Sequence, residues 1–242
     1  MTNPIFNQNV VERENILDSE PMTINGAINK SFVLFGILLA ASLVVWDMFF
    51  KGYTDKVVML GTVGFITGII SFIVIMVNRK VISIAAPIYA ASEGLLLGAI
   101  SAYIEKAYPG IAIQAVGLTM MCLFSMLFLY RIRAIKCTEK FRSVIFISTL
   151  SICGIYLINL LGSFFGLQIP QIFTSSYIGI GFSLLVVGIA SLNLIIDFDF
   201  IERGAQQMLG KTYEWYGAFG LMVTLVWLYI EILNLLTKLR DR

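Results

Sequence analysis

The sequence predicts an all-α polytopic membrane protein built as a seven-transmembrane-helix bundle. Of its 242 residues, 58% are hydrophobic and only 13% are charged, whereas a soluble domain usually has about 25% charged residues. The apolar residues also gather into seven segments of about 20 residues, the length that a helix needs to cross a bilayer. One aqueous core cannot bury so much apolar surface, so we expect the lipid bilayer to be the solvent of this chain.

The chain divides into a polar N-terminal segment, residues 1–31, and a transmembrane domain, residues 32–242. The first segment has no apolar run near Met1, so we expect no cleaved secretory signal. The dipeptide Asn25-Gly26 predicts a turn before the first span. The seven spans are predicted at 32–50, 58–78, 84–104, 110–130, 143–164, 173–197 and 214–237.

The predicted connections are short, and the two longer ones, 131–142 and 198–213, carry most of the charge. Glycines recur inside the spans, several of them four residues apart. They are Gly64 and Gly68, Gly94 and Gly98, and, in the sixth span, Gly179, Gly181 and Gly188. Glycines at such spacing let helix backbones approach closely in lipid. Kinks or hinges are the alternative explanation.

Lys and Arg are unequally divided between the two sides of the predicted bundle. One side holds eleven: Arg13, Lys30, Arg79, Lys80, Arg131, Arg133, Lys136, Lys140, Arg142, Arg203 and Lys211. The other side holds six: Lys51, Lys56, Lys106, Lys238, Arg240 and Arg242. The positive-inside rule therefore predicts a cytoplasmic N-terminus and a C-terminus outside. A seventh segment that re-enters the membrane would instead return the basic tail to the cytoplasm.

The composition excludes several kinds of chemistry. The chain has no histidine, which excludes Ser-His-Asp and Cys-His catalysis, histidine-ligated metals and an imidazole pH switch. The three cysteines, Cys122, Cys137 and Cys153, lack metal-ligand spacing, so we expect packing residues or reduced thiols. No phosphate-binding or dinucleotide-binding glycine motif occurs. The net charge of +2 is too small to indicate nucleic-acid binding, and the Lys and Arg residues form no dense patch. We expect no enzyme, no cofactor, no metal site and no nucleic-acid partner.

Carboxylates inside the predicted spans are the candidate functional residues, because an isolated charge at mid-bilayer costs at least about 3 kcal/mol. Glu93 lies about ten residues into the third span. It is either a functional acid or a protonated acid hydrogen-bonded to a neighbouring helix. Glu231 lies deep in the seventh span, seven positions before Lys238, and Asn234 extends the same polar stripe. Glu231 must face the bundle or water, and we interpret it as functional.

Three further acids lie near the ends of the spans. Asp197 and Asp199 end the sixth span, and residues at i and i+2 do not share a helix face. We expect Asp197 to face the bundle and Asp199 to meet solvent, and two acids at the level of the headgroups are the alternative. Glu214 begins the seventh helix, where we expect a structural cap at the positive end of the helix dipole.

Four stretches carry a family resemblance: 22–30 (MTINGAINK), 87–94 (PIYAASEG), 197–204 (DFDFIERG) and 228–235 (LYIEILNL). Together they make the chain similar to the Bax inhibitor-1 family, also called the transmembrane Bax inhibitor motif family, and particularly to its bacterial branch. The resemblance covers about residues 22–240. It implies a protein of the bacterial cytoplasmic membrane, with the C-terminal helix central in the bundle.

The resemblance also implies a pH-sensitive calcium leak, in which one acid of the sixth helix and one of the seventh share a proton. These acids fall on Asp197 and Glu231, and Arg79 and Lys80 are candidates for a basic residue that joins them. The family more often has Asp at the seventh-helix position, so Glu231 reaches one methylene further.

Thirty-four residues separate Asp197 from Glu231. If the seventh helix begins near Tyr213, Glu231 lies eighteen residues into it, about 27 Å along the axis. Direct pairing then requires the sixth helix to continue past Asp197 or the seventh helix to bend. Otherwise the acids act as separate stations, with Glu93 as an intermediate partner of Glu231.

We therefore expect a channel that leaks calcium or another cation and is controlled by protonation of buried carboxylates. Burial raises the pKa of a carboxylate in general, and two acids that share a site titrate separately. The alternative is a non-conducting membrane regulator that binds a partner through the acidic N-terminal segment. Some bacterial relatives are described as modulating a membrane-bound ATP-dependent protease, so such a protease is the expected partner.

Overall fold

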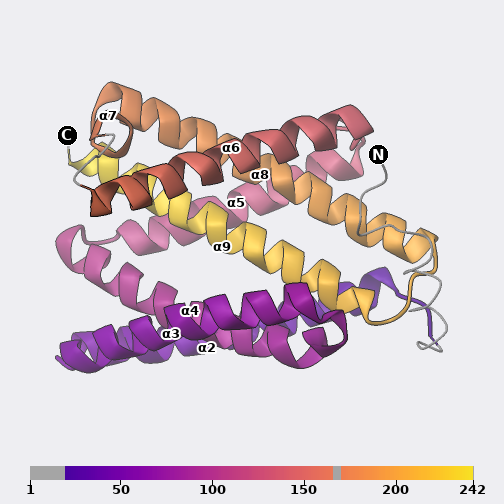
Figure 1. Cartoon of the computed structure of the whole chain (residues 1–242), viewed down its shortest axis with the longest axis horizontal. Coiled ribbons are helices and arrows are strands. Elements are labelled where there is room, and N and C mark those ends of the chain that lie inside the picture. The colour runs from indigo at the N-terminus through magenta and orange to yellow at the C-terminus, as the bar shows by residue number, and fades with distance from the viewer. Residues whose placement is uncertain (1–19, 166–169, 242) are drawn as a thin grey trace. The chain divides into compact units, whose positions relative to one another are not determined.

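Seven long helices account for the predicted spans. The computed structural model describes residues 20–165 and 170–241. The helices are α2 (Ile24–Phe50), α3 (Thr54–Val77), α4 (Ile82–Ala107), α5 (Ile111–Arg131), α6 (Glu139–Phe164), α8 (Tyr177–Gln206) and α9 (Tyr213–Arg240), with the short η2 (Arg79–Val81) and α7 (Pro170–Phe173) between them (Figure 1). Seven of these helices are long and apolar enough to cross a membrane, and the described residues contain no strand. The predicted all-α fold class with seven membrane-spanning helices is confirmed, and the central place of the C-terminal helix stays a prediction.

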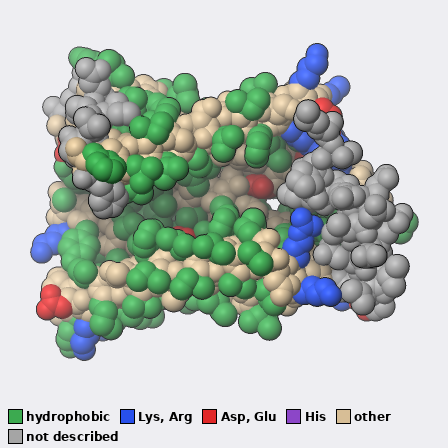
Figure 2. All heavy atoms as spheres, viewed as in Figure 1, with side chains coloured by type: hydrophobic (Ala, Val, Ile, Leu, Met, Phe, Trp, Pro, Cys, Tyr) green, Lys and Arg blue, Asp and Glu red, His purple; other side chains and the backbone are tan. Residues whose placement is uncertain are grey.

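Large apolar side chains cover the outside of these helices. Phe32 is 72% exposed, Val77 82% and Ile113 76%. Figure 2 shows hydrophobic side chains along the helices, with Lys and Arg side chains near the helix ends. Apolar surface on this scale would associate in water, whereas in a bilayer it contacts lipid chains while each helix satisfies its own backbone hydrogen bonds. The chain is therefore a multi-pass membrane protein.

The chain forms two compact units. The first contains the described part of Met1–Ala102 together with Asp197–Met222, and the second contains the described part of Tyr103–Ile196 together with Val223–Arg242. The helices α4, α8 and α9 each contribute residues to both units.

Glycines bring α2, α3 and α4 together in the first unit. A Cβ atom on Gly64 of α3 would lie 2.5 Å from the carbonyl oxygen of Ser92 on α4. A Cβ atom on Gly98 of α4 would lie 2.6 Å from the carbonyl oxygen of Ser42 on α2. These helices therefore pack backbone against backbone, as the glycine spacing predicts. The packing interpretation does not extend to Gly181 and Gly188 of α8, since no described atom of this kind lies within 4 Å of a Cβ atom at either position.

Polar contacts position the helices of the second unit. Glu105 accepts hydrogen bonds from the backbone N–H groups of Gly110, at 2.6 Å, and Ala112, at 3.0 Å. It thereby satisfies N–H groups at the start of α5 that have no partner within the helix. Asn193 of α8 donates to the Thr149 hydroxyl of α6 at 3.0 Å.

The first helix begins earlier than predicted. α2 starts at Ile24, eight residues before position 32, so Asn25-Gly26 lies in its first turn and the turn prediction is wrong. Thr23 explains the difference, because its backbone is extended and its hydroxyl accepts from the Gly26 N–H at 2.9 Å, the geometry of an N-cap. Helix α2 thus includes part of the segment predicted as polar. Residues 1–19 of that segment lie outside the described residues.

The sixth long helix ends later than predicted. α8 continues to Gln206, nine residues beyond position 197, so most of the predicted 198–213 connection is helical. The added turns bury Ile201 and Phe198, which are 6% and 9% exposed. One of the conditions considered for pairing Asp197 with Glu231, a helix that continues past Asp197, is therefore met. Helix α9 begins at Tyr213, as assumed.

Candidate functional site

Glu231 is buried within α9 in the second unit. The residue is 3% exposed. Its Oε1 atom accepts one hydrogen bond from the Tyr156 hydroxyl of α6, at 2.7 Å, and one from the indole Nε1 of Trp227, at 3.1 Å. Trp227 lies one turn earlier on α9, so one donor comes from the same helix and one from another. These two donors replace part of the water that a carboxylate loses on burial.

A small cavity lies beside Glu231. Its volume is about 130 Å³, and its lining includes Glu231, Asn234 and Lys238 of α9. Tyr156, Phe173, Phe182 and Ser183 form the rest of the lining. A space of this size holds a few water molecules or one small ion, provided that polar groups face it. The polar stripe predicted for Glu231 and Asn234 therefore faces a common space.

The ammonium group of Lys238 is held by three oxygen atoms at this cavity. Its Nζ donates to the Ser183 hydroxyl at 2.9 Å, to the Ile172 carbonyl at 3.1 Å and to the Gly179 carbonyl at 3.3 Å. Three acceptors match the three N–H donors of an ammonium group. The site thus contains a carboxylate and a basic group that line one cavity.

Gly179 and Ser176 explain why the backbone oxygens converge on Lys238. A Cβ atom on Gly179 would lie 3.0 Å from the Ile172 carbonyl oxygen and would collide with the carbonyl of Thr174. Only glycine therefore lets the chain before α8 cross this turn of the helix so closely. The Ser176 hydroxyl accepts from the Gly179 N–H at 3.0 Å, which caps the start of α8.

Three aromatic rings form the apolar side of the cavity. Tyr156 packs against Phe173, with ring centroids 5.7 Å apart, and against Phe182, at 6.3 Å. Phe173 and Phe182 are 6.5 Å apart. These distances are typical of favourable aromatic pairs, and they fix the ring whose hydroxyl binds Glu231. Sequence reasoning missed Tyr156 and Trp227. A signal existed only for Trp227, which precedes Glu231 by one helical turn.

Glu93 has a different environment in the first unit. It is half-buried and accepts a hydrogen bond from Tyr89, one turn earlier on α4. A Cβ atom on Gly68 of α3 would lie 3.5 Å from Glu93 Oε1, so the carboxylate faces the glycine surface of α3. The hydrogen-bond donor of Glu93 thus lies on its own helix, whereas the alternative considered for this acid placed the partner on a neighbouring helix.

Asp197 and Asp199 are both enclosed by protein, also in the first unit. Asp199 is 4% exposed and pairs with Arg203, whose Nε lies 2.9 Å from Oδ2. The expectation that Asp199 meets solvent is wrong, because α8 continues and supplies Arg203 one turn later. Asp197 is half-buried, and its Oδ1 lies 3.4 Å from the position of a Cβ atom on Gly220 of α9.

The two candidate basic partners lie on η2. Arg79 is half-buried, and within the described part of the chain its Nη1 atom is enclosed without a hydrogen-bond partner. Lys80 is exposed, and its backbone N–H donates to the Asn78 side chain at 3.2 Å. A basic partner for the acids at either position stays a prediction.

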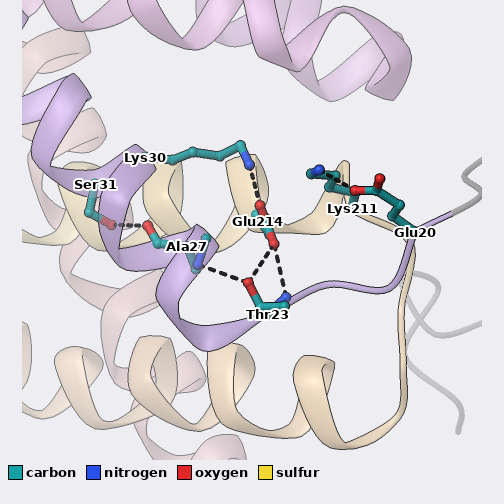
Figure 3. A network of polar contacts seen from close by, with 8 residues as sticks. Glu20, Thr23, Ala27, Lys30, Ser31, Lys211 and Glu214 are labelled. Atoms are coloured by element: carbon teal, nitrogen blue, oxygen red, sulfur yellow. Dashed lines mark hydrogen bonds and ion pairs between the residues drawn. The ribbon is translucent and has the colours of Figure 1, made fainter.

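Glu214 is a second deeply buried glutamate of α9, and it belongs to the first unit. It is 2% exposed. Its Oε1 accepts from the Thr23 N–H at 2.9 Å and from the Thr23 hydroxyl at 3.0 Å, and its Oε2 pairs with Lys30 (Figure 3). The predicted role as a cap of its own helix is therefore incomplete, since these bonds join the start of α9 to the start of α2.

Neighbouring contacts strengthen this junction, which we call the N-terminal clasp and define as residues 20–30 with 209–214. The Met22 N–H donates to the Leu209 carbonyl at 2.6 Å, and the Lys211 N–H donates to the Glu20 carbonyl at 3.0 Å. The side chains of Glu20 and Lys211 also form an ion pair (Figure 3). No local pattern signals these contacts, because Thr23 and Glu214 are 191 residues apart.

Comparison with protein families matches residues 3–241 to the family model described as Bax inhibitor 1 like. Comparison with curated proteins gave no match, and comparison with solved structures gave none either. The family match covers nearly the whole chain and includes all seven helices that can cross a membrane. The chain therefore belongs to the Bax inhibitor-1 family.

Proposed function

We propose that this protein is a pH-sensitive cation leak channel of the bacterial cytoplasmic membrane, with calcium as the expected ion, and that protonation of buried carboxylates gates it. One observation carries the proposal: Glu231 is 3% exposed in a membrane-spanning helix and lines a cavity of about 130 Å³. Ionisable groups inside a membrane are costly and usually mark an ion or proton path. The protein is expected to conduct ions and to catalyse no reaction.

The contacts of Glu231 suggest how a proton would act. As a carboxylate, Glu231 accepts from Tyr156 and Trp227 and carries a charge opposite to that of Lys238, which lines the same cavity. Protonation removes this negative charge, and with it the attraction for Lys238 or for a cation in transit. A proton shifts a closed–open equilibrium if it binds Glu231 more tightly in one state than in the other, and a different attraction from Lys238 or a cation in the two states supplies that difference.

The other predicted acids have contacts of their own. Glu93 accepts a hydrogen bond from Tyr89, Asp199 pairs with Arg203, and Asp197 faces Gly220. We propose that Glu231 senses the proton, while Asp197, Asp199 and Glu93 act on the path as separate stations.

Calcium flux in liposomes tests the proposal. We expect purified protein to release calcium at a rate that depends on pH, and Glu231→Gln to remove most of that dependence. Glu139→Gln is the matched control, since the Glu139 side chain is 83% exposed. Equal flux from wild type and from the Glu231→Gln, Asp197→Asn double variant at every pH would contradict the proposal.

The second candidate is a non-conducting regulator that binds a membrane-bound ATP-dependent protease. One observation favours it: the acidic segment that contains Glu12, Glu14 and Asp18 leads directly into Glu20 of the N-terminal clasp. A partner that binds this segment could therefore act on the start of α9. Crosslinking from position 12, lost on deletion of residues 1–19 and combined with no flux in liposomes, would favour this function over the channel.

The orientation is part of the same proposal. We propose that the N-terminus is cytoplasmic, because the Lys and Arg count favours that side by eleven to six. A cysteine introduced at position 12 should then be protected from a membrane-impermeant thiol reagent in intact cells and react after lysis. Labelling in intact cells would show that the N-terminus lies outside.

A further inference from the structure

The ammonium group of Lys238 occupies a position that suits a free cation. Its three partners are all oxygens, at 2.9 to 3.3 Å, from Ser183, Ile172 and Gly179. Carbonyl, hydroxyl and carboxylate oxygens are the ligands that alkali and alkaline-earth cations prefer. Two of the three are backbone carbonyls, the group that replaces the hydration shell of potassium in selective channels.

A carboxylate and a further amide complete the same space. Glu231 lines the cavity that Lys238 lines, and Asn234 lies between them on α9. Ser183 is only 2% exposed, so its hydroxyl is directed into protein and not into solvent. The cavity lining therefore presents the oxygens of Ser183, Asn234 and Glu231. The carbonyls of Ile172 and Gly179 join Ser183 at the ammonium group of Lys238. Together these oxygens form a donor set for a hard cation.

A purely structural role for Lys238 leaves these features unexplained. Lysine near a helix C-terminus can bind free carbonyls and so hold a helix end. The end of α9 is already held by Arg240, which donates to the Pro109 carbonyl at 2.8 Å and to the Gln114 side chain at 3.3 Å. The carboxylate of Asp241 adds hydrogen bonds from Tyr108 and Ser175. Holding the helix end also requires no cavity and no buried carboxylate.

We propose that the carbonyls of Ile172 and Gly179, the hydroxyl of Ser183 and the carboxylate of Glu231 form a binding site for a hard inorganic cation, and that Lys238 is the tethered cation that fills it in this state. That this cation is the transported one rests on the proposed channel function. The binding site itself rests on the contacts of Lys238 and on the cavity.

The geometry indicates how Lys238 would compete with a free ion. A group on the same chain acts at an effective concentration in the millimolar range or higher, so a free cation at lower concentration does not displace it. Calcium binds oxygens at about 2.3–2.6 Å, so the oxygens that surround the ammonium would have to close inward by about 0.5 Å. A larger monovalent cation needs less movement, and separate measurements with potassium and calcium distinguish the two.

Thermal unfolding in detergent tests the site without any flux measurement. The variant is Lys238→Met, which keeps most of the side-chain length and removes the charge. Melting temperatures are compared with potassium chloride or calcium chloride against choline chloride at constant ionic strength. We expect Lys238→Met to melt about 3 °C higher when the cation is present at ten times its Kd, whereas wild type shifts by less than about 1 °C.

Two further variants show where the cation binds. Adding Glu231→Gln or Ser183→Ala to Lys238→Met should remove most of the cation-dependent shift. Lys51→Met is the matched control, since Lys51 lies at the end of α2, as Lys238 lies in the last turn of α9, and its side chain is 63% exposed. It should respond to cations as wild type does.

Each remaining outcome is informative. The proposal is overturned if Lys238→Met gains no shift with either cation, or if the shift persists unchanged in both double variants. Lys238→Gln serves as a second neutral variant. If neither neutral variant folds, the ammonium is required by the fold and the proposal fails. A cation-dependent shift in melting temperature without flux in liposomes would support the binding site and contradict the channel function. Flux without the shift would support the channel function and contradict the binding site.

Discussion

The two buried glutamates of α9 are equally shielded from solvent but have different surroundings. Glu214 and Glu231 are 2% and 3% exposed. Glu214 takes two hydrogen bonds from Thr23 and a direct ion pair from Lys30, whereas Glu231 takes hydrogen bonds from two neutral donors. Burial alone therefore does not identify a functional acid in a membrane protein. The number and charge of the donors distinguish Glu214 from Glu231, for which we propose a functional role.

The space near each glutamate supports the same distinction. A hollow of about 480 Å³ borders the N-terminal clasp and is lined by Glu214, Lys30 and Lys211 among others. Its acids and bases are paired with one another, Glu214 with Lys30 and Glu20 with Lys211. At the smaller cavity, Lys238 is bonded to oxygens of uncharged groups, and Glu231 to uncharged donors. In the second arrangement, the described contacts give neither charge a direct ion pair, which is why we propose that it responds to an ion or a proton.

The largest expected effect is on stability, from Glu214→Ala. The change leaves Lys30 and the Thr23 donors without their acceptor, and breaking a buried ion pair destabilises by about 3–5 kcal/mol. Because Lys30 retains some exposure, with 17% of its side chain accessible, we expect a value near the lower end. A melting temperature lower by about 6–12 °C follows for a chain of this size. Glu139→Ala is the control, and a shift below 2 °C in Glu214→Ala would show that the clasp does not hold the fold.

A smaller effect is expected from Gly26→Ala, which overfills the same clasp. A Cβ atom at this position would overlap the carboxylate of Glu214. Overpacking of this kind destabilises by about 1–3 kcal/mol. Gly36→Ala is the control, since no neighbouring atom lies within 4 Å of its Cβ position and it also lies in α2. Calorimetry that finds equal melting temperatures for the two variants would contradict the close contact.

The N-terminal clasp also illustrates which features the sequence could predict and which it could not. Composition and segment length predict seven membrane helices, because lipid imposes both on any span. The start of α2 differs from the prediction, because a contact with a distant residue helps to fix it. Thr23 caps α2 while binding Glu214, which is 191 residues away. Polar residues near a span end are therefore ambiguous until their partners are known.

The candidate site shows the same limit. The depth of Glu231 in an apolar segment is visible in the sequence, and so is its stripe with Asn234. Tyr156 lies 75 residues away in sequence, and nothing around it indicates that its hydroxyl binds a carboxylate. The three oxygens around Lys238 depend on the chain crossing at Gly179, which only the folded backbone brings about. Depth along a helix was predictable, whereas partners across helices were not.

A still smaller effect on stability is expected from Tyr156→Phe. The change removes one donor to Glu231 and keeps the ring that packs on Phe173 and Phe182, so the loss should be about 1 kcal/mol. The pH dependence of calcium flux should change, because Tyr156 interacts directly with the proposed proton-sensing group. Tyr103→Phe, at a 43% exposed position, is the control. If the variant and wild type have the same dependence of flux on pH, Tyr156 has no part in gating.

The smallest effect on stability is expected from Glu231→Gln, although Glu231 is as buried as Glu214. The glutamine oxygen can accept the same hydrogen bonds from Tyr156 and Trp227, and no direct ion pair is broken, so the free energy of unfolding should change by less than about 1 kcal/mol. The same replacement at Glu214 removes the charge that Lys30 binds and should destabilise more. Thermal unfolding of both variants side by side measures this difference. If Glu231→Gln is the more destabilised of the two, Glu231 is a structural anchor like Glu214, and the comparison on which its functional role rests fails.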